Sequence, residues 1–145
     1  MEYNFRKLDY MDYYREYLNL LSELTVCNYE NINFKDFCDR LDLIIRSNTH
    51  IYVLEHNNKI IATGTLLIEN KFIHDLSCVG HIEDVVIKKE FRGFKIGKKI
   101  IEYLTGIAKE NNCYKTILDC GNHNISFYEK CNFKVNGTQM SMYFE

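Results

Sequence analysis

Proline is absent from the 145 residues, and so are internal repeats, linker-like stretches and low-complexity tracts. We attribute the missing proline, together with the many Asn, Ile, Lys and Tyr residues, to genomic bias rather than to function. Because nothing marks a domain boundary, we expect a single domain over residues 1–145. A hydrophobic content of 46% is sufficient for a sizeable core in a chain of this length.

Long apolar runs and paired cysteine motifs are also missing. No run approaches the ~18 apolar residues of a membrane-spanning helix, so no membrane partner is expected. The six cysteines form no CxxC motif, and a lone Cys120-x-x-His123 has no partner motif, so no metal site is expected. No signal peptide precedes the first amphipathic segment, which predicts free thiols in a reducing, cytoplasmic setting.

A strong excess of either charge is lacking as well. The 18 basic and 20 acidic residues give a net charge of -2, which argues against general affinity for nucleic acid. Residues 88–99, however, hold six basic residues and one acidic residue, so this segment carries +5 and the remainder -7. The cluster is either a solvated turn or a local anion site. Its aromatic residues do not interleave with the basic ones as nucleic-acid stacking platforms require.

Hydrophobic periodicity predicts the element order β-α-α-β-β-β-α-β-α-β. Asp9 and Asn33 are expected to cap the first two helices, and Asn57-Asn58 is expected to form the tight turn of a hairpin. This order indicates an α+β (mixed α/β) fold rather than a doubly wound sheet. The expected strands cover residues 2–8, 50–70 (the hairpin), 81–87 with a possible extension over 75–80, 114–120 and the C-terminus; the helices cover 10–24, 34–45, 97–110 and 124–131.

The segment "EDVVIKKEFRGFKIGKK", residues 83–99, joins an apolar strand to a helix through a basic loop. It fails as a Walker A loop, because Gly93 and Gly97 enclose three residues and a lysine replaces the final hydroxyl. It fails as G-x-G-x-x-G, because only two glycines are present. It fits R/Q-x-x-G-x-G/A with Arg92 and Gly97 at the outer positions, although Lys95 stands where glycine is usual. Backbone amides at such a helix start bind anions, and glycine would let a diphosphate approach closely. On this segment alone, an ordinary strand-to-helix turn is an equally good interpretation.

Five segments appear in an order typical of one enzyme family: "ATGTLLIE", "KFIHDLSCVGHIEDVVI", "RGFKIGKKII", "NCYKTILDC" and "NISFYEKCNF". Together they resemble the GNAT superfamily of N-acetyltransferases, and within it the family of glucosamine 6-phosphate N-acetyltransferases. The resemblance covers nearly the whole chain and is strongest from Lys71 onward. It implies a GNAT acyltransferase fold, with a central mixed, mostly antiparallel sheet whose splayed middle strands are flanked by helices.

The same resemblance implies an activity. Acetyl-CoA would donate an acetyl group directly to the amine of glucosamine 6-phosphate in a ternary complex, for UDP-N-acetylglucosamine biosynthesis, without a metal and within a homodimer. Tyr128 would protonate the departing thiolate. Asp119 would orient the amine and help to remove its proton, with Glu83 as a further catalytic carboxylate beside the sugar.

The remaining assignments also follow from the resemblance. The residues assigned to the cofactor, besides Tyr128, are Val85, Val86, Ile87, Arg92, Gly93, Phe94, Lys95, Ile96, Gly97, Lys98 and Asn124. The residues assigned to the amino-sugar phosphate are Thr25, Lys71, Phe72, Ile73, His74, Glu83, Asp84, Leu118 and Asp119.

Each assignment has a plainer alternative. Tyr128 is one of eleven tyrosines and could simply pack a helix. Glu83 and Asp84 are consecutive carboxylates in an apolar strand, so they need either a function or a strand end or bulge where both reach water. Lys71 and His74 suit a phosphate, yet such residues at a hairpin edge are usually solvated.

One position departs from the family pattern. Tyr143 stands where the family has an arginine that helps to bind the sugar phosphate, often across a dimer interface. Two other functions therefore stay open. One is acetylation of another small amine or of a peptide, and the other is a non-catalytic module that binds acyl-CoA.

Overall fold

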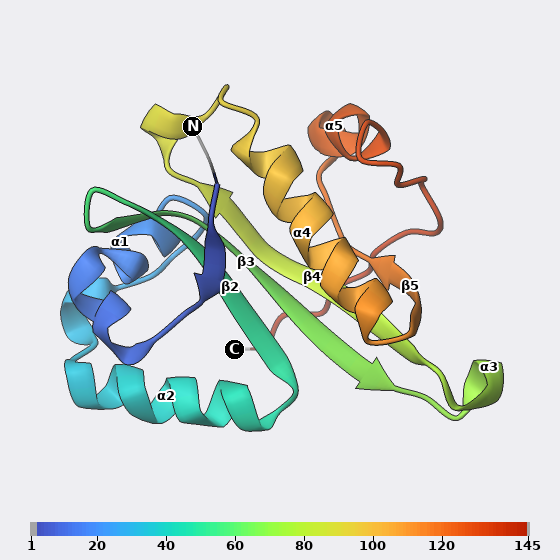
Figure 1. Cartoon of the computed structure of the whole chain (residues 1–145), viewed down its shortest axis with the longest axis horizontal. Helices are drawn as coiled ribbons and strands as arrows, with labels where there is room; N and C mark the ends of the chain where they lie inside the picture. Colours follow the sequence, from blue (N-terminus) through green and yellow to red (C-terminus); the bar gives the residue numbers. More distant parts are fainter. Residues whose placement is uncertain (1–2, 145) are drawn as a thin grey trace.

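The fold is described from a computed structural model over residues 3–144. A five-stranded sheet in the order β1-β2-β3-β4-β5 forms the centre of the molecule (Figure 1). The first four strands pair antiparallel to one another, and β5 pairs parallel to β4. The predicted mixed, mostly antiparallel sheet is therefore confirmed. The strands are β1 (Phe5–Lys7), β2 (Thr49–His56), β3 (Lys59–Asn70), β4 (Cys78–Ile87) and β5 (Cys113–Ile117).

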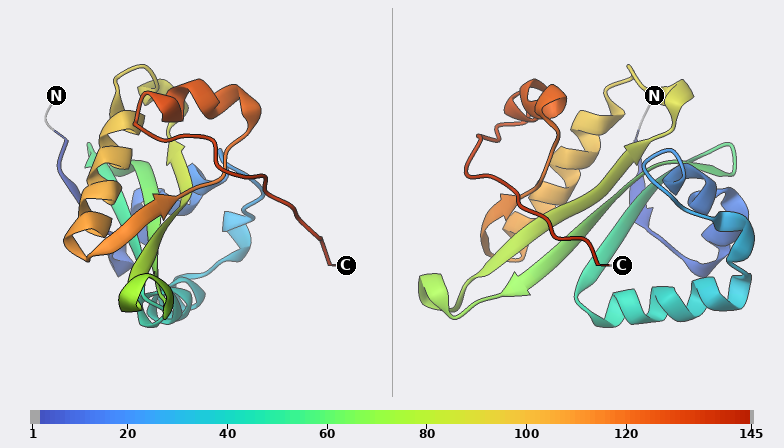
Figure 2. Two further views of the ribbon diagram at one scale, coloured as in Figure 1. Left: turned by 90° about the vertical axis from the view of Figure 1, so that its right-hand side faces the viewer. Right: turned by 180° about the vertical axis from the view of Figure 1, so that it is seen from behind.

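Helices cover both faces of this sheet (Figure 2). The helices α1 (Tyr17–Leu21) and α2 (Phe34–Arg46) pack on one face, and α4 (Ile96–Glu110) packs on the other. The short helix α5 (Ile125–Glu129) lies beside the start of α4 (Figure 1). The 3-10 turns are η1 (Tyr10–Arg15), η2 (Tyr29–Asn31), η3 (Lys89–Phe91) and η4 (Asn122–Asn124). None of the helices in residues 3–144 combines the length and apolar composition needed to cross a membrane.

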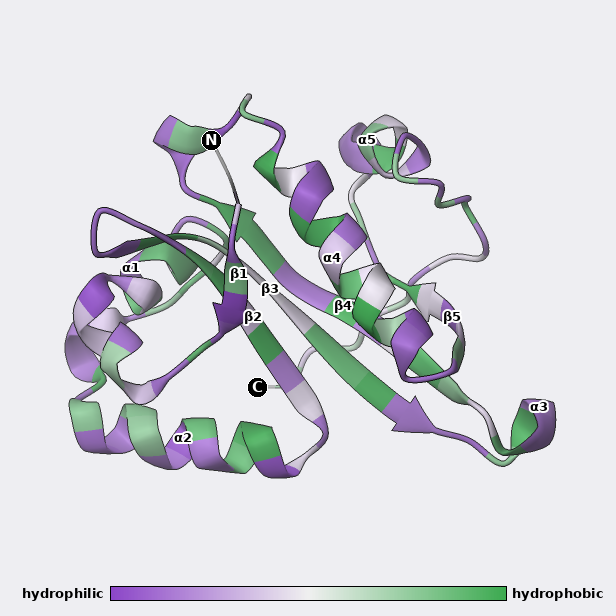
Figure 3. Cartoon of the chain, in the orientation of Figure 1, coloured by the Kyte–Doolittle hydropathy of each residue, from purple (hydrophilic) through white to green (hydrophobic). Residues whose placement is uncertain are grey.

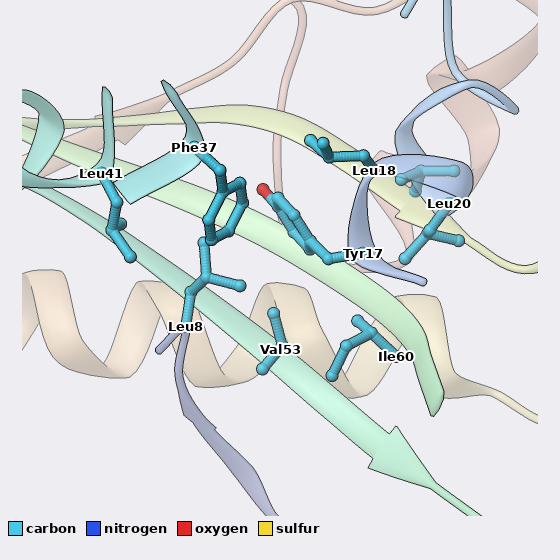
Figure 4. Packing of buried hydrophobic residues seen from close by; sticks show 9 residues of the cluster. Leu8, Tyr17, Leu18, Leu20, Phe37, Leu41, Val53 and Ile60 are labelled. Carbon is cyan, nitrogen blue, oxygen red and sulfur yellow. The ribbon is translucent and has the colours of Figure 1, made fainter. Parts of the chain in front are cut away.

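Two apolar layers hold the helices on the sheet. Along α2 and α4, apolar and polar residues alternate, as expected for helices with one buried face (Figure 3). Each large side chain that is fully buried in these layers contributes about 1.5–3 kcal/mol. The layer under α1 and α2 is shown in Figure 4 and contains Leu8, Tyr17, Leu18, Leu20, Phe37, Leu41, Val53 and Ile60. The layer under α4 includes Leu66, Ile82, Ile100, Ile101 and Leu104.

The first predicted helix, over residues 10–24, is broken into η1 and α1. Glu16 between them has a φ of 63°, a left-handed conformation that ends the first turn. Asp9 caps the turn as predicted, and Asp12 accepts a hydrogen bond of 2.9 Å from the Asp9 amide. The tight turn aims Asp12 inward, where its side chain is 0% exposed and Arg6 and Arg15 bind it. Burial alone would raise the pKa of Asp12, but these hydrogen bonds outweigh burial and lower it.

Most other predicted elements are present, with shifted bounds. The hairpin turn at Asn57-Asn58 is confirmed, with φ values of 50° and 62°. The opening strand covers only Phe5–Lys7, and Glu2 of the predicted range lies outside the described residues. The prediction of a C-terminal strand is wrong for the described residues, because residues 134–144 run without secondary structure (Figure 2). A strand requires a partner strand, and this segment pairs with none, although the outer edge of β5 is free in the described residues.

The middle strands part as the GNAT resemblance implies. Pairing between β4 and β5 runs from Cys78↔Cys113 to His81↔Ile117, whereas β4 continues to Ile87. Among the described residues, β4 has no strand partner on its β5 side beyond His81, and the chain after β5 leaves β4 toward α5 (Figure 1). We call this stretch of β4, residues 82–87, together with residues 118–119 after β5, the wedge. The start of α4 and the helix α5 flank this wedge (Figure 1). The predicted splaying is confirmed.

Candidate active site

A β-bulge in β4 forms one side of the wedge. Thr65 pairs with Glu83 and Thr63 pairs with Val86, so two residues of β4 oppose the single residue Gly64. Asp84 takes up the extra residue with a φ of 50°. Glu83 and Asp84 consequently both reach solvent, as the bulge interpretation of these carboxylates predicts.

Glu83 lies among other acidic groups in the wedge. Desolvation raises the pKa of Glu83, the negative charges of Asp119 and Asp84 raise it further, and His81 lowers it. Asp119 follows β5 directly and is exposed, while Leu118 before it packs against the α4 layer. The carboxylate of Asp119, after the end of β5, is thus close enough for its charge to act on Glu83 of β4. A carboxylate with a raised pKa is a stronger base than an ordinary carboxylate when it is ionised, which makes Glu83 a candidate proton acceptor.

The loop before α4 supplies the other side of the wedge. Gly93 has a φ of 92°, and Lys95, where the family pattern has glycine, keeps the left-handed conformation with a φ of 63°. The start of α4 has no side-chain cap, so the first-turn amides of Ile96 to Lys98 have no partner within the helix. These amides lie at the positive end of the helix dipole, which suits a diphosphate. The hydroxyl of Tyr3 donates a hydrogen bond of 2.6 Å to the carbonyl of Phe94 and ties this loop to the N-terminal segment.

Some residues assigned to the cofactor have other uses for their side chains. Ile96 and Val86 are buried in the apolar layers, so only their backbone groups are available to a ligand. Arg92 donates through Nε to the carbonyl of Ile87 at 3.0 Å. Its Nη2 atom lies 3.7 Å from Oε1 of Glu23, and the same Glu23 oxygen accepts a hydrogen bond of 2.9 Å from the amide of Lys89. Glu23 therefore organises the basic loop, a role that sequence reasoning missed.

Gly97 marks a close contact between α4 and α5. A Cβ atom on Gly97 would lie 3.2 Å from Cζ of Phe127, closer than side chains normally pack. The missing side chain of Gly97 was expected to leave room for a diphosphate. The ring of Phe127 instead occupies the space next to the position where a Cβ atom would lie. This contact fixes α5, and with it the neighbouring Tyr128, relative to the helix start.

Tyr128 lies on α5, next to the α4 layer. The residue is half-buried and packs against the rings of Phe127 and Phe133. Burial raises the pKa of Tyr128, and the nearby Cys120 and Cys131 raise it further. Asn124 precedes α5 and is exposed. A hydroxyl with a raised pKa stays protonated at neutral pH, as a proton donor must.

The residues assigned to the sugar phosphate do not all meet in this chain. Thr25 follows α1, and residues 71–74 lie at the turn labelled α3 (Ile73–Leu76), at the opposite end of the molecule (Figure 1). The backbone of His74 and of the two residues after it is left-handed. The His74 ring stacks on the ring of Tyr114, with 4.0 Å between the ring centroids. Lys71 turns back toward the sheet, so that Nζ lies 3.0 Å from Oε2 of Glu69.

Comparison with known proteins agrees with this geometry. The profile described as "Acetyltransferase (GNAT) family" matches residues 11–133. Glucosamine 6-phosphate N-acetyltransferase of Candida albicans is 42% identical over 141 residues, which cover 95% of this chain and 93% of that protein. Glucosamine 6-phosphate N-acetyltransferase 1 of Dictyostelium discoideum is 40% identical over 144 residues, which cover 97% of this chain and 90% of that protein.

A solved structure matches the whole fold. The crystal structure of glucosamine-6-phosphate N-acetyltransferase from Arabidopsis thaliana superimposes with a TM-score of 0.94 at 39% identity, and the match covers 100% of both chains. The splayed strands and these similarities lead to the same conclusion. The chain belongs to the GNAT family of acetyltransferases.

Proposed function

We propose that the protein transfers the acetyl group of acetyl-CoA to the amine of glucosamine 6-phosphate, giving N-acetylglucosamine 6-phosphate for UDP-N-acetylglucosamine synthesis. The observation that supports the proposal is the wedge, where β4 loses its partner next to the carboxylates Glu83 and Asp119, with the uncapped start of α4 and the helix of Tyr128 beside it. The names of the relatives from Candida albicans, Dictyostelium discoideum and Arabidopsis thaliana support the choice of acceptor.

The residues of the chain fit acetyl-CoA and have separate tasks. The amides at the start of α4, with Lys95 and Lys98, would hold the diphosphate. The cofactor supplies a thioester, whose carbonyl carbon accepts an amine directly. Asp119 would orient the amine. Glu83, helped by Asp119, would take the proton from the amine as the C–N bond forms. Tyr128 would donate its proton to the sulfur as the C–S bond breaks. No acyl-enzyme is needed, because both reactants meet in one wedge.

Lys71 is the residue best suited to the acceptor phosphate. Its ammonium lies beside Glu69, on the same strand pair as Glu83. Tyr143, at the position of the family arginine, is 93% exposed in the described structure and offers no positive charge. Phosphate binding therefore relies on Lys71 and His74 rather than on the C-terminus.

A homodimer is also proposed, on three structural grounds. The tail, residues 134–144, carries exposed apolar side chains, including Met140 at 92%. The turn α3 likewise exposes Phe72 at 90%. In the described residues β5 ends the sheet, so its outer edge is open to another strand. A second copy of the chain would cover these surfaces and would bring the phosphate-binding turn of one copy toward the wedge of the other.

The homodimer predicts a specific sedimentation result. Replacing Met140 and Met142 together by aspartate should convert a dimer into a monomer at micromolar concentration, because buried unpaired charges oppose association. Leu43→Asp, which removes an exposed apolar residue on α2, should leave the mass unchanged and serves as the control. A wild-type protein that sediments as a monomer would refute the homodimer.

The proposed function is tested by release of the CoA thiol. Glucosamine 6-phosphate should be acetylated at least ~100-fold more efficiently than glucosamine, because a charge-assisted phosphate contact contributes about 1.5–3 kcal/mol and both Lys71 and His74 can donate hydrogen bonds to the phosphate. If a peptide or another amine is acetylated more efficiently than glucosamine 6-phosphate, that compound is the acceptor and the proposed acceptor is wrong. Binding of acetyl-CoA without turnover on any amine would instead favour the non-catalytic module.

A cytoplasmic setting is part of the same proposal. The sulfur atoms of Cys78 and Cys113 lie 3.3 Å apart, beyond the length of a disulfide bond of about 2.05 Å. Thiols this close persist in a reducing compartment.

A further inference from the structure

A row of charged side chains crosses β3 and β4 next to the wedge. The ring nitrogen Nε2 of His81 lies 2.9 Å from Oε1 of Glu69, and the other oxygen of Glu69 binds Lys71 at 3.0 Å. A carboxylate can only accept hydrogen bonds, so Nε2 of His81 carries the hydrogen. The His81 side chain is 24% exposed, and this single contact fixes the orientation of its ring against the sheet.

The His81 end of this row lies next to Glu83 on β4. His81 and Glu83 are two residues apart on β4, opposite Leu67 and Thr65 of β3. Side chains at such positions project from the same face of a strand. The imidazole is therefore a direct neighbour of the carboxylate that would accept the amine proton.

The charges around Glu83 indicate what His81 does there. Glu83 must be ionised to act as a base, yet Asp84 on β4 and Asp119 after β5 raise its pKa. His81 is the group that lowers this pKa. Behind the imidazole, one oxygen of Glu69 on β3 holds the ring in place, and the other oxygen of Glu69 binds Lys71.

We propose that His81, oriented by Glu69, is a positioning residue that favours the ionised form of Glu83 beside the acceptor amine. This inference rests on the proposed acetyl transfer and adds two residues to its machinery. A merely structural role for the cluster would be to hold the end of the β3–β4 hairpin together. Such a role affects the unfolding midpoint but does not affect the titration of Glu83.

The decisive measurement is the titration of the Glu83 carboxyl carbon by NMR in the resting protein. In His81→Gln, the pKa of Glu83 should rise, because the one neighbour that lowers it is lost. A base must lose its proton before it can act, so the acid limb of kcat/KM for the acceptor should move to higher pH. On that limb kcat/KM should fall by the same factor by which the acid dissociation constant of Glu83 decreases in the NMR titration. The KM for acetyl-CoA should stay constant.

A matched control is available on β2. His50 is held in the same way, with Nε2 3.0 Å from Oδ1 of Asn48, but away from Glu83. His50→Gln should therefore leave the titration of Glu83 unchanged. Glu69→Gln should act in the same direction as His81→Gln, and the double variant should be no worse than His81→Gln alone, because Glu69 acts through the ring.

The outcomes separate this inference from the proposed function. An unchanged titration of Glu83 in His81→Gln, or additive effects of the two substitutions, would overturn the inference. The NMR titration needs no turnover, so it reports on His81 even if no amine is acetylated. A raised pKa of Glu83 in a protein without acetyl transfer would support the coupling while refuting the function.

Discussion

Tyr128→Phe is expected to lower kcat by about 10²- to 10⁴-fold, the usual contribution of a general acid. The substitution removes only the hydroxyl, and the ring would keep its contacts with Phe127 and Phe133. Affinity for acetyl-CoA, measured by calorimetry without an acceptor, should therefore change little. The expected result is a large loss of turnover in a protein that still binds its donor.

The pH dependence provides a second check on this role. An acid must be protonated to act, and burial raises the pKa of Tyr128 above its ordinary value of about 10. The wild-type enzyme should thus keep this acid form through the neutral range and lose it only above the raised pKa. Tyr103→Phe, on α4 and packed against Phe5 and Tyr52, is the control with unchanged kcat. Equal turnover of the Tyr128 and Tyr103 variants would exclude the acid role.

Gly97→Val is expected to weaken acetyl-CoA binding by about 10- to 100-fold. The added side chain would collide with Phe127, and relief of such overpacking typically costs 1–3 kcal/mol. Either the first turn of α4 shifts and loses its diphosphate geometry, or α5 moves and displaces Tyr128. Turnover should therefore fall together with affinity, whereas Tyr128→Phe affects turnover alone.

The same helix contains a suitable control for Gly97. Gly106 lies further along α4, and an added Cβ there would meet nothing within 4 Å. Gly106→Val changes the intrinsic helix propensity in the same way but causes no collision. Calorimetry with CoA should distinguish the two variants, with Gly97→Ala between them. Matching affinities for the two valine variants would disprove the role of the contact with Phe127.

Local patterns predicted the local features of the fold correctly. The apolar spacing of residues 97–110 corresponds to α4, and Asn57-Asn58 forms the turn of the hairpin. The consecutive carboxylates Glu83 and Asp84 indicated either a function or a bulge, and the structure contains the bulge. Each of these signals depends on neighbours in sequence, which is why the sequence was sufficient.

Contacts between distant segments were not predictable in this way. Glu23 binds the loop at Lys89 across 66 positions, and no spacing rule connects the two residues. The ring that fills the space at Gly97 belongs to a helix whose position depends on the complete sheet. The C-terminal strand was predicted from the local pattern, but strand formation depends on pairing with a distant strand, which local patterns do not reveal. The roles of the individual site residues, including Asp119 and Lys71, stay predictions until they are tested.

The contact between Gly97 and Phe127 also has an evolutionary consequence. Gly97 has no side chain, and the ring of Phe127 fills the space that a side chain there would need. The summed side-chain volume of the two positions is therefore constrained more tightly than the volume of either side chain alone. A descendant that acquired a side chain at position 97 would persist only after position 127 had become smaller. Among diverged sequences of this lineage, the two positions should therefore covary in size.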